Sequence, residues 1–183
     1  MRIDAYLFEN RKYPSRTKAS EAILRGEIKV NDKIVTKPSY DVKESDNIVV
    51  SDLALNFVSN GGYKLEKALS EFSVNVYGKT FCDVGASTGG FTDCLLRRGA
   101  SKVFTVDVGE SLLSDQLKKD DRVVIIDNFN ARYLTIDVLG NFVDGVVCDV
   151  SFISLTYVLK PIYNILKDDG FAITLIKPQF EVG

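Results

Sequence analysis

The chain has 183 residues, of which 45% are hydrophobic and 26% are charged, and its formal net charge is −2. This composition is typical of a folded globular protein and excludes a disordered chain. No apolar run approaches the length of about 18 residues that a membrane helix needs, and the first residues contain no apolar signal core. We therefore expect a soluble cytoplasmic protein with no membrane partner.

Histidine is absent, and the sequence contains three cysteines. Without histidine the chain forms neither a Ser–His or Cys–His nucleophile nor a His-ligated zinc site. Cys82, Cys94 and Cys148 show no C-x-x-C spacing, so we expect no metal site and no disulfide framework. We interpret them as buried free thiols. Acid–base chemistry then depends on Lys, Asp, Glu or Tyr.

Residues 1–56 predict a small α+β domain. Helices are expected at 2–8 and 16–25, the second with Ser15 as its N-cap and Gly26 at its end. Short strands are expected at 27–30, 33–35 and 47–50, and the first two are joined by a hairpin turn at 31–32.

Positive charge gathers at the start of the chain. Residues 1–37 hold nine Lys and Arg against five Asp and Glu, although the whole chain is mildly acidic. This distribution indicates a local contact with a polyanion. A solvated charged face explains the charge alone equally well.

Strand and helix patterns alternate through the rest of the chain. We interpret residues 57–62 as a linker and residues 63–183 as a second domain. Strands are expected at 80–84, 102–107, 123–126, 143–148 and 171–176, and helices at 63–72, 89–98, 111–118 and 155–166. This α/β alternation predicts a doubly wound parallel sheet, which binds ligands at the carboxyl ends of its strands.

The strongest local signal is the glycine-rich segment 83–91, DVGASTGGF, between a strand and a helix. Glycines let the backbone approach a ligand closely. The segment lacks the middle glycine of the dinucleotide fingerprint and starts with an acid, which favours a ligand with a cationic amino-acid end over a pyrophosphate. Asp107 ends the next strand and suits a ribose diol. S-adenosylmethionine carries both groups, and a glycine-rich turn without a ligand is the alternative.

The candidate cofactor-binding residues follow from this reading. They are Asp83, Gly85, Ala86, Ser87, Thr88, Gly89, Gly90, Phe91 and Asp107, with Asp127, Asn128 and Asn130 as weaker candidates for the adenine side.

Four motifs occur in a fixed order in the second domain. They are GGYKLEKAL at 61–69, DVGASTGGFTD at 83–93, CDVSFISL at 148–155 and IKPQFEVG at 176–183. Through them residues 60–183 resemble the hemolysin-A-like (TlyA) family of ribosomal RNA 2′-O-methyltransferases, which are related to the FtsJ methyltransferases. Residues 1–56 resemble the S4-type RNA-binding domain that precedes the methyltransferase domain in that family. The resemblance implies a Rossmann-like methyltransferase fold and S-adenosylmethionine as the cofactor.

The family's catalytic set is Lys–Asp–Lys–Glu, and the resemblance places its first three members at Lys64, Asp149 and Lys177. In such a reaction a ribose 2′-hydroxyl loses its proton as it attacks the sulfonium methyl group. A lysine serves as the base only when partial burial and a second cation lower its pKa. The resemblance implies Lys177 as the base, Lys64 as the second cation and Asp149 as the carboxylate that orients the ammonium.

For the first domain the resemblance implies phosphate contacts with structured RNA, and ribosomal RNA or a ribosomal subunit as the partner. The family suggests cytidine as the modified nucleotide. The candidate RNA-binding residues are Arg2, Ser15, Arg16, Lys18, Arg25 and Lys29.

The family fold continues through two more strands after the fifth, and its fourth catalytic residue, a Glu, lies there. The printed sequence ends at Gly183, and Glu181 is not assigned that role. We therefore expect a C-terminally truncated chain that binds cofactor weakly, methylates RNA slowly or not at all, and aggregates or dimerises through an exposed sheet edge. The alternatives to an enzyme are an RNA-binding fragment without methyl transfer and, remotely, a membrane-lytic hemolysin.

Overall fold

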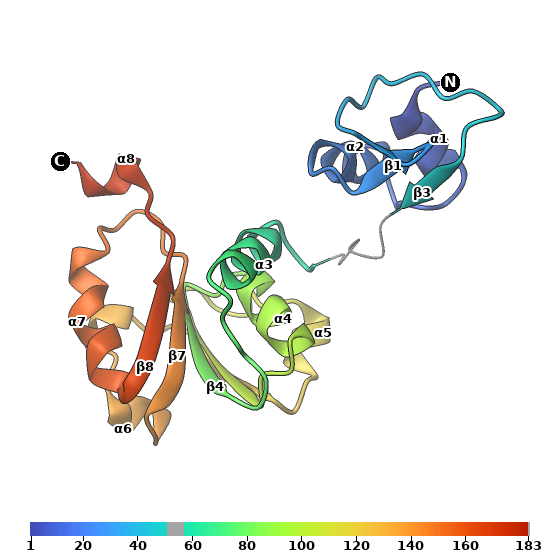
Figure 1. Ribbon diagram of the computed structural model, residues 1–183. Coiled ribbons are helices and arrows are strands. Elements are labelled where there is room, and N and C mark those ends of the chain that lie inside the picture. The colour runs from blue at the N-terminus through green and yellow to red at the C-terminus, as the bar shows by residue number, and fades with distance from the viewer. Residues whose placement is uncertain (51–56, 183) are drawn as a thin grey trace. The chain divides into compact units, whose positions relative to one another are not determined.

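The computed structural model describes residues 1–50 and 57–182, which fall into two compact units, Met1–Asn56 and Phe57–Gly183 (Figure 1). Each unit is described by itself. The boundary expected after residue 56 and the last residue of the final motif, Gly183, lie outside the described residues.

The first unit packs two helices, α1 (Ile3–Glu9) and α2 (Arg16–Leu24), with a small antiparallel sheet. The sheet has the order β2-β1-β3 and consists of β1 (Ile28–Val30), β2 (Lys33–Val35) and β3 (Ile48–Val50). The Ser15 hydroxyl accepts a hydrogen bond from the Lys18 amide, so the expected N-cap is confirmed. The turn at Asn31 and Asp32 has φ of 48° and 64°, the backbone that a tight hairpin requires.

A parallel five-stranded sheet forms the centre of the second unit, in the order β6-β5-β4-β7-β8 (Figure 1). Its strands are β4 (Thr80–Val84), β5 (Lys102–Val106), β6 (Val123–Ile126), β7 (Val143–Cys148) and β8 (Leu166–Thr174). The predicted α/β class is confirmed. The strand order reverses between β4 and β7, and in such sheets the ligand crevice lies at that reversal.

The longer helices of this unit are α3 (Gly61–Glu71), which precedes β4, α4 (Gly90–Arg97) and α7 (Thr156–Ile165). The shorter elements are α5 (Asp115–Lys118), the 3₁₀ turn η1 (Ala131–Tyr133), α6 (Ile136–Leu139) and α8 (Pro178–Glu181), which follows β8. Residues alternate between the two faces of β4. Cys82 and Val84 pack with Ile162 of α7, whereas Asp83 points to the other face, toward Thr92 of α4. The sheet is thus covered on both faces, and an ionisable side chain occupies its centre.

Residues 57–62 do not form a linker between the units. Phe57 is buried, and its ring fills the space where a Cβ at Gly62 would lie. The Val58 amide donates a 2.9 Å hydrogen bond to the buried carboxylate of Asp93. These contacts make the segment part of the second unit, and α3 begins at Gly61, two residues before its expected start.

The helix expected at 111–118 forms only over Asp115–Lys118. Ser111 has a left-handed φ of 56°, and its amide donates a hydrogen bond to the Asp127 carboxylate. Its backbone therefore forms a turn instead of the start of a helix. The last strand, β8, starts at Leu166 rather than at 171. The sequence does not predict that start, because the first strand residues include the exposed and polar Lys167, Asp168 and Asp169 and show no apolar strand pattern.

All three cysteines are free and buried, as expected. Burial raises the pKa of each of the three thiols. Protonated buried thiols are poor nucleophiles. The cysteines therefore serve as small apolar core residues.

Candidate active site

The glycine-rich loop after β4 meets the loop after β7 at the point where the strand order reverses. Gly85 has a φ of +78°, and a Cβ at this position would lie 2.8 Å from the carbonyl oxygen of Asp149. A side chain would therefore separate the two loops. The close approach brings the backbone of the loop next to Asp149, at the carboxyl ends of the two central strands.

The same loop brings α3 to this end of the sheet. A Cβ at Gly90, the first residue of α4, would lie 2.8 Å from the backbone nitrogen of Gly62 and would clash with the Ser59 hydroxyl. The first turns of α3 and α4 are therefore in contact. Lys64 stands on that first turn of α3 and is exposed.

Asp83 is a buried acid at this end of the sheet, and its pKa is raised. It is fully buried, and its Oδ2 accepts a 2.7 Å hydrogen bond from the Thr92 hydroxyl. Its Oδ1 is buried without a hydrogen-bond partner among the described residues. Burial raises the pKa of this carboxyl to about 7, and the carboxylates of Asp149 and Asp107 add to the rise, while hydrogen bonds from Thr92 oppose it. The unpartnered oxygen marks a place for a hydrogen-bond donor, preferably a cationic one.

Asp107 follows β5, and two backbone amides hold its carboxylate in place. Oδ2 accepts from the Ser87 amide at 2.8 Å, and Oδ1 accepts from the Gly109 amide at 2.9 Å. Each carboxylate oxygen has a second lone pair, so both can still accept from a ligand. The pair of bonds also ties the glycine-rich loop to the end of β5.

A pocket of about 350 Å³ lies against this carboxylate. Of the residues expected to bind a cofactor, Gly85, Ser87, Asp107 and Asn130 line it, together with Asp149. The rest of the lining is mainly apolar and consists of Val106, Val108, Leu112, Phe129, Ala131, Val150, Ser151, Phe152, Ile153 and Val158. A mostly apolar pocket with a few fixed polar groups is typical of small-molecule sites.

Sequence reasoning missed these apolar walls. Val150, Phe152 and Ile153 belong to the motif at 148–155, whereas Val108, Leu112, Phe129 and Ala131 lie outside the four motifs, and nothing in the sequence indicates that these residues meet in one pocket. Two of the weaker candidates do not line the pocket. Asp127 instead accepts from the Ser111 amide, and the Asn128 amide donates to the Gly109 carbonyl, so both shape the neighbouring turn.

The other candidates in the glycine-rich segment form the loop rather than the pocket lining. Ala86, Gly89, Gly90 and Phe91 are buried, whereas Thr88 is exposed and its carbonyl accepts from the Ser114 amide. Their contribution is to hold the backbone in the shape that Gly85 and Ser87 need.

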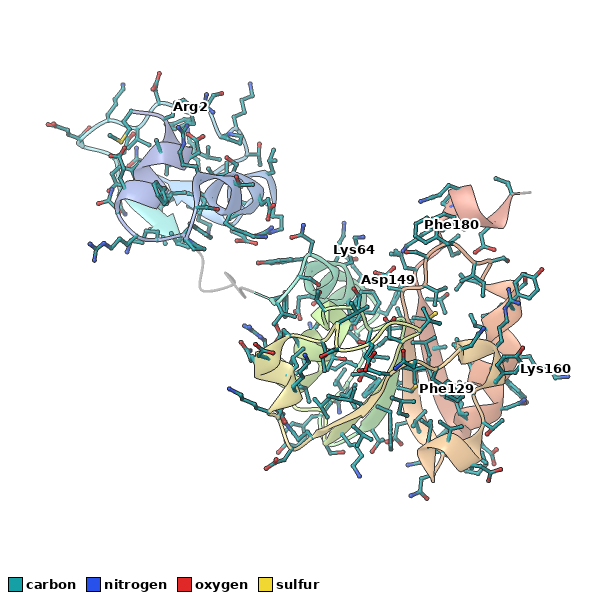
Figure 2. All side chains as sticks on the ribbon, turned by 180° about the vertical axis from the view of Figure 1, so that it is seen from behind. Arg2, Lys64, Phe129, Asp149, Lys160 and Phe180 are labelled. Atoms are coloured by element: carbon teal, nitrogen blue, oxygen red, sulfur yellow. The ribbon has the colours of Figure 1, made fainter. Side chains whose placement is uncertain are left out.

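The structure brings Asp149 and Lys177 into direct contact. The Lys177 Nζ lies 2.7 Å from the Asp149 Oδ1 and donates a 2.7 Å hydrogen bond to the Ser151 hydroxyl. Ser151 was not anticipated from the sequence. Lys64 forms no hydrogen bond or ion pair within the described part of the chain, and Figure 2 shows it at the same end of the second unit as Asp149.

In the first unit the candidate RNA-binding residues surround buried or partly buried acids. Arg2 and Arg16 both donate to the carboxylate of Asp4, at 3.1 Å and 2.9 Å. Burial alone would raise the pKa of Asp4, but hydrogen bonds from Arg16, Arg2 and the Ala5 amide together lower it. Both guanidinium groups remain about half exposed, so Asp4 fixes them without hiding them.

The other candidate RNA-binding residues differ in whether another group of the chain already pairs with them. Lys18 pairs with Glu21 at 2.9 Å, and Arg25 pairs with Glu27 at 2.5 Å. The Ser15 hydroxyl is used by the helix cap. Lys29 is exposed, and no described residue pairs with it.

Comparison with known proteins assigns a similarity to each unit. The family model described as FtsJ-like methyltransferase matches residues 57–183, and the model described as S4 domain matches residues 1–48. "Hemolysin A" of Brachyspira hyodysenteriae is 45% identical over 182 residues, which are 99% of this chain and 75% of that protein. "16S/23S rRNA (cytidine-2′-O)-methyltransferase TlyA" of Mycobacterium tuberculosis is 42% identical over 183 residues, which are 100% of this chain and 68% of that protein.

Among solved structures, a putative hemolysin from Streptococcus thermophilus is similar over the whole chain, with a TM-score of 0.69 and 36% identity. The match covers 100% of this chain and 68% of that one.

Asp83 makes the stability of the second unit depend on pH. Its pKa in the folded state, about 7, lies above the ordinary value of 3.8. The folded state therefore binds a proton that the unfolded state has lost, and the free energy of unfolding falls as pH rises from about 4 to about 7. We expect Asp83→Asn to remove this dependence and to stabilise the unit at pH 8 by up to a few kcal/mol, on the order of 1.4 kcal/mol per unit of pKa shift.

Denaturant unfolding of the second unit at pH 5 and pH 8 measures the effect. The exposed acid Asp168 provides a matched control, because Asp168→Asn should leave the difference between the two pH values unchanged. If the free energy of unfolding changes by the same amount between pH 5 and pH 8 in the wild type and in Asp83→Asn, this assignment is wrong.

Proposed function

Because this chain belongs to the family of FtsJ-like methyltransferases, we propose that it transfers the methyl group of S-adenosylmethionine to a ribose 2′-hydroxyl of ribosomal RNA, with cytidine as the modified nucleotide. The observation that carries the proposal is the unpartnered buried oxygen of Asp83 beside Asp107 and Asp149, where the strand order reverses.

The residues present fit this cofactor. A buried acid with an open acceptor suits the ammonium of an amino acid, and the two neighbouring carboxylates, Asp107 and Asp149, favour a ligand of positive charge. The carboxylate of Asp107, fixed by two amides, suits the two hydroxyls of a ribose. Phe129 and the other apolar walls suit a purine. When bound, S-adenosylmethionine supplies an electrophilic methyl group.

Asp149 and Lys177 are proposed to act together in removing the proton of the ribose 2′-hydroxyl. The Asp149 carboxylate and the Ser151 hydroxyl hold the Lys177 Nζ from two sides, so its position is set before substrate arrives. We assign to Lys177 the removal of the proton from the 2′-hydroxyl, and to Lys64 the second positive charge at the same end of the sheet. A positioned general base contributes roughly 10²–10⁴-fold to rate.

An aromatic side chain stands next to this pair. Phe152 is 91% exposed and lies against Phe180, with ring centroids 5.2 Å apart. An exposed ring beside the reacting groups offers a surface on which an unpaired base can stack. Such stacking would hold a target nucleotide outside its helix during the reaction.

The first unit is proposed to bind the RNA. An S4 domain model matches it, and the half-exposed guanidinium groups of Arg2 and Arg16 are held side by side on Asp4. Fixed guanidinium groups bind phosphate with little loss of side-chain entropy. Lys18 and Lys29 add positive charge, whereas Arg25 is engaged by Glu27.

The name of the Brachyspira relative suggests membrane lysis. Within residues 1–50 and 57–182, no helix has the length and apolar character that a membrane span requires. An RNA-binding protein without methyl transfer is the remaining alternative, and the three experiments below separate it from the enzyme.

The first experiment tests cofactor binding. Replacing Asp107 by Ala removes a charged acceptor, and each hydrogen bond to a charged group is worth roughly 1.5–3 kcal/mol. We expect the Kd for S-adenosylmethionine to rise about tenfold or more by this rule. Isothermal titration calorimetry measures the change, and Asp107→Asn, which keeps one acceptor oxygen, should show a smaller loss. Equal affinity in all three proteins would remove Asp107 from the site.

The second experiment tests RNA binding. In Arg16→Ala/Lys18→Ala we expect weaker binding to ribosomal RNA and a shallower dependence on salt. Each lost phosphate contact reduces the salt slope by about 0.9 for a duplex or about 0.7 for a single strand, with DNA values as the guide. The variant Lys79→Ala/Lys102→Ala removes the same charge near the amino ends of β4 and β5 and should bind normally. An unchanged salt slope in Arg16→Ala/Lys18→Ala would place the RNA contact elsewhere.

The third experiment tests the reaction. Transfer of labelled methyl from S-adenosylmethionine to ribosomal RNA is measured for this chain, for Lys177→Ala and for Lys167→Ala. We expect Lys177→Ala to lose about 10²-fold or more, the usual contribution of a general base, and Lys167→Ala to be unaffected. Equal transfer by Lys177→Ala would exclude Lys177 as the base. Binding of both ligands without transfer by the unsubstituted chain would favour the RNA-binding alternative.

A further inference from the structure

The loop that carries Asp149 and Ser151 has a strained backbone that contacts with other parts of the chain must stabilise. It runs from Asp149 to Leu155 between β7 and α7, and five of its residues line the pocket. Phe152 in its centre has a left-handed φ of 62°. A left-handed backbone at a residue other than glycine costs about 1–3 kcal/mol and persists only where surrounding contacts enforce it.

The segment after β8 supplies three such contacts. Lys177 contacts Asp149 and Ser151, and the Phe180 ring packs on Phe152. Glu181 is the third, and it contacts the C-terminal end of the loop. We call these contacts of residues 177–181 with residues 149–155 the clasp. The spacing of 177, 180 and 181 places the three side chains within about one helical turn, and the short helix α8 provides that turn.

Glu181 forms the most specific part of the clasp. Its Oε2 accepts a 2.6 Å hydrogen bond from the Ser154 hydroxyl, and its Oε1 accepts a 2.9 Å hydrogen bond from the Leu155 amide. Leu155 is the N-cap residue of α7, and its side chain cannot cap the helix. Glu181 thus binds the start of α7 from a distant part of the chain. The hydrogen bond from Ser154, followed by that from Leu155, lowers the pKa of Glu181, so the carboxylate is charged at neutral pH.

The clasp joins two of the four motifs in the second unit. Residues 148–155 supply Asp149, and residues 176–183 supply Lys177, so the pair that the reaction needs forms only if these segments stay in register. An ion pair between partly exposed side chains is weak by itself. The two hydrogen bonds of Glu181 restrict the motion of both backbones next to that pair.

We propose that Glu181 is a positioning residue that holds the segment of Lys177 on the loop of Asp149 and so keeps the Lys177 amine between Asp149 and Ser151. It acts through these residues and does not contact the reacting atoms. The importance of the pair for methyl transfer rests on the proposed function, whereas the positioning itself is independent of it.

The reactivity of Lys177 tests the positioning directly. The full chain is treated with an N-hydroxysuccinimide ester of acetate, and the acetylation rate of each lysine is measured by mass spectrometry. In Glu181→Ala we expect Lys177 to react roughly threefold to tenfold faster, the factor that corresponds to one net hydrogen bond. Glu181→Gln keeps one acceptor oxygen and should show a smaller rise. Lys167, which pairs with Asp144 at the other end of β8, is the internal control and should not change.

Other outcomes have definite meanings. An unchanged Lys177 rate in Glu181→Ala overturns the proposal, as does an equal rise at Lys167, which would indicate general loosening. If Glu181→Ala does not fold, Ser154→Ala removes one of the two hydrogen bonds, and an unchanged Lys177 rate there also overturns it.

Methyl transfer is measured on the same variants. We expect kcat to fall about tenfold in Glu181→Ala, with little change in KM for S-adenosylmethionine and partial rescue in Glu181→Gln. Unchanged kcat in a chain whose Lys177 has become reactive would refute a role for the clasp in the reaction. Absence of transfer by the unsubstituted chain contradicts the proposed function instead, and leaves the acetylation result to decide the positioning.

Discussion

The second unit depends on the close approach of two loops at the centre of its sheet. Gly85, after β4, and Asp149, after β7, meet where a single added carbon atom would touch the Asp149 carbonyl oxygen. The parallel sheet brings the two strand ends together, and the absence of a side chain lets the loops close. Everything that the site uses, from the pocket to the Asp149–Lys177 pair, is arranged around this contact.

That contact has an electrostatic consequence. It gathers Asp83, Asp107 and Asp149 at one edge of the sheet, and among these three only Asp149 pairs with a cation within residues 1–50 and 57–182. Asp107 is held by two amides, and one oxygen of Asp83 accepts no hydrogen bond from the part of the chain that the structure describes. A cationic ligand would reduce the repulsion among the carboxylates and would donate the hydrogen bond that Asp83 lacks. Both effects favour the binding of a positively charged ligand.

The two units use charge in different ways. In the first unit, the buried carboxylate of Asp4 holds two arginine side chains at the surface, where their positive charges stay half exposed. In the second, the partly exposed carboxylates of Asp107 and Asp149 line a pocket, and the buried Asp83 has one oxygen without a hydrogen-bond partner among the described residues. Under the proposed function, the first unit binds RNA phosphates, and the second binds a cationic cofactor next to the reacting nucleotide. The clasp adds a third use, in which the charged carboxylate of Glu181 binds the start of α7 and aligns two distant motifs.

Local sequence patterns were enough to predict the alternation of strands and helices, the Ser15 cap, the hairpin at Asn31 and Asp32, and the acids that follow strands. Each of these features depends on local periodicity or on the backbone preference of one residue. It did not reveal that residues 57–62 pack on the second unit, that β8 begins at Leu166, or that Phe129 and its neighbours form the pocket wall. These features depend on the packing of the folded chain, as do the contacts of Ser151 with Lys177 and of Glu181 with Leu155. They join residues 26 positions apart through the fold, and no local pattern encodes a partner at that distance.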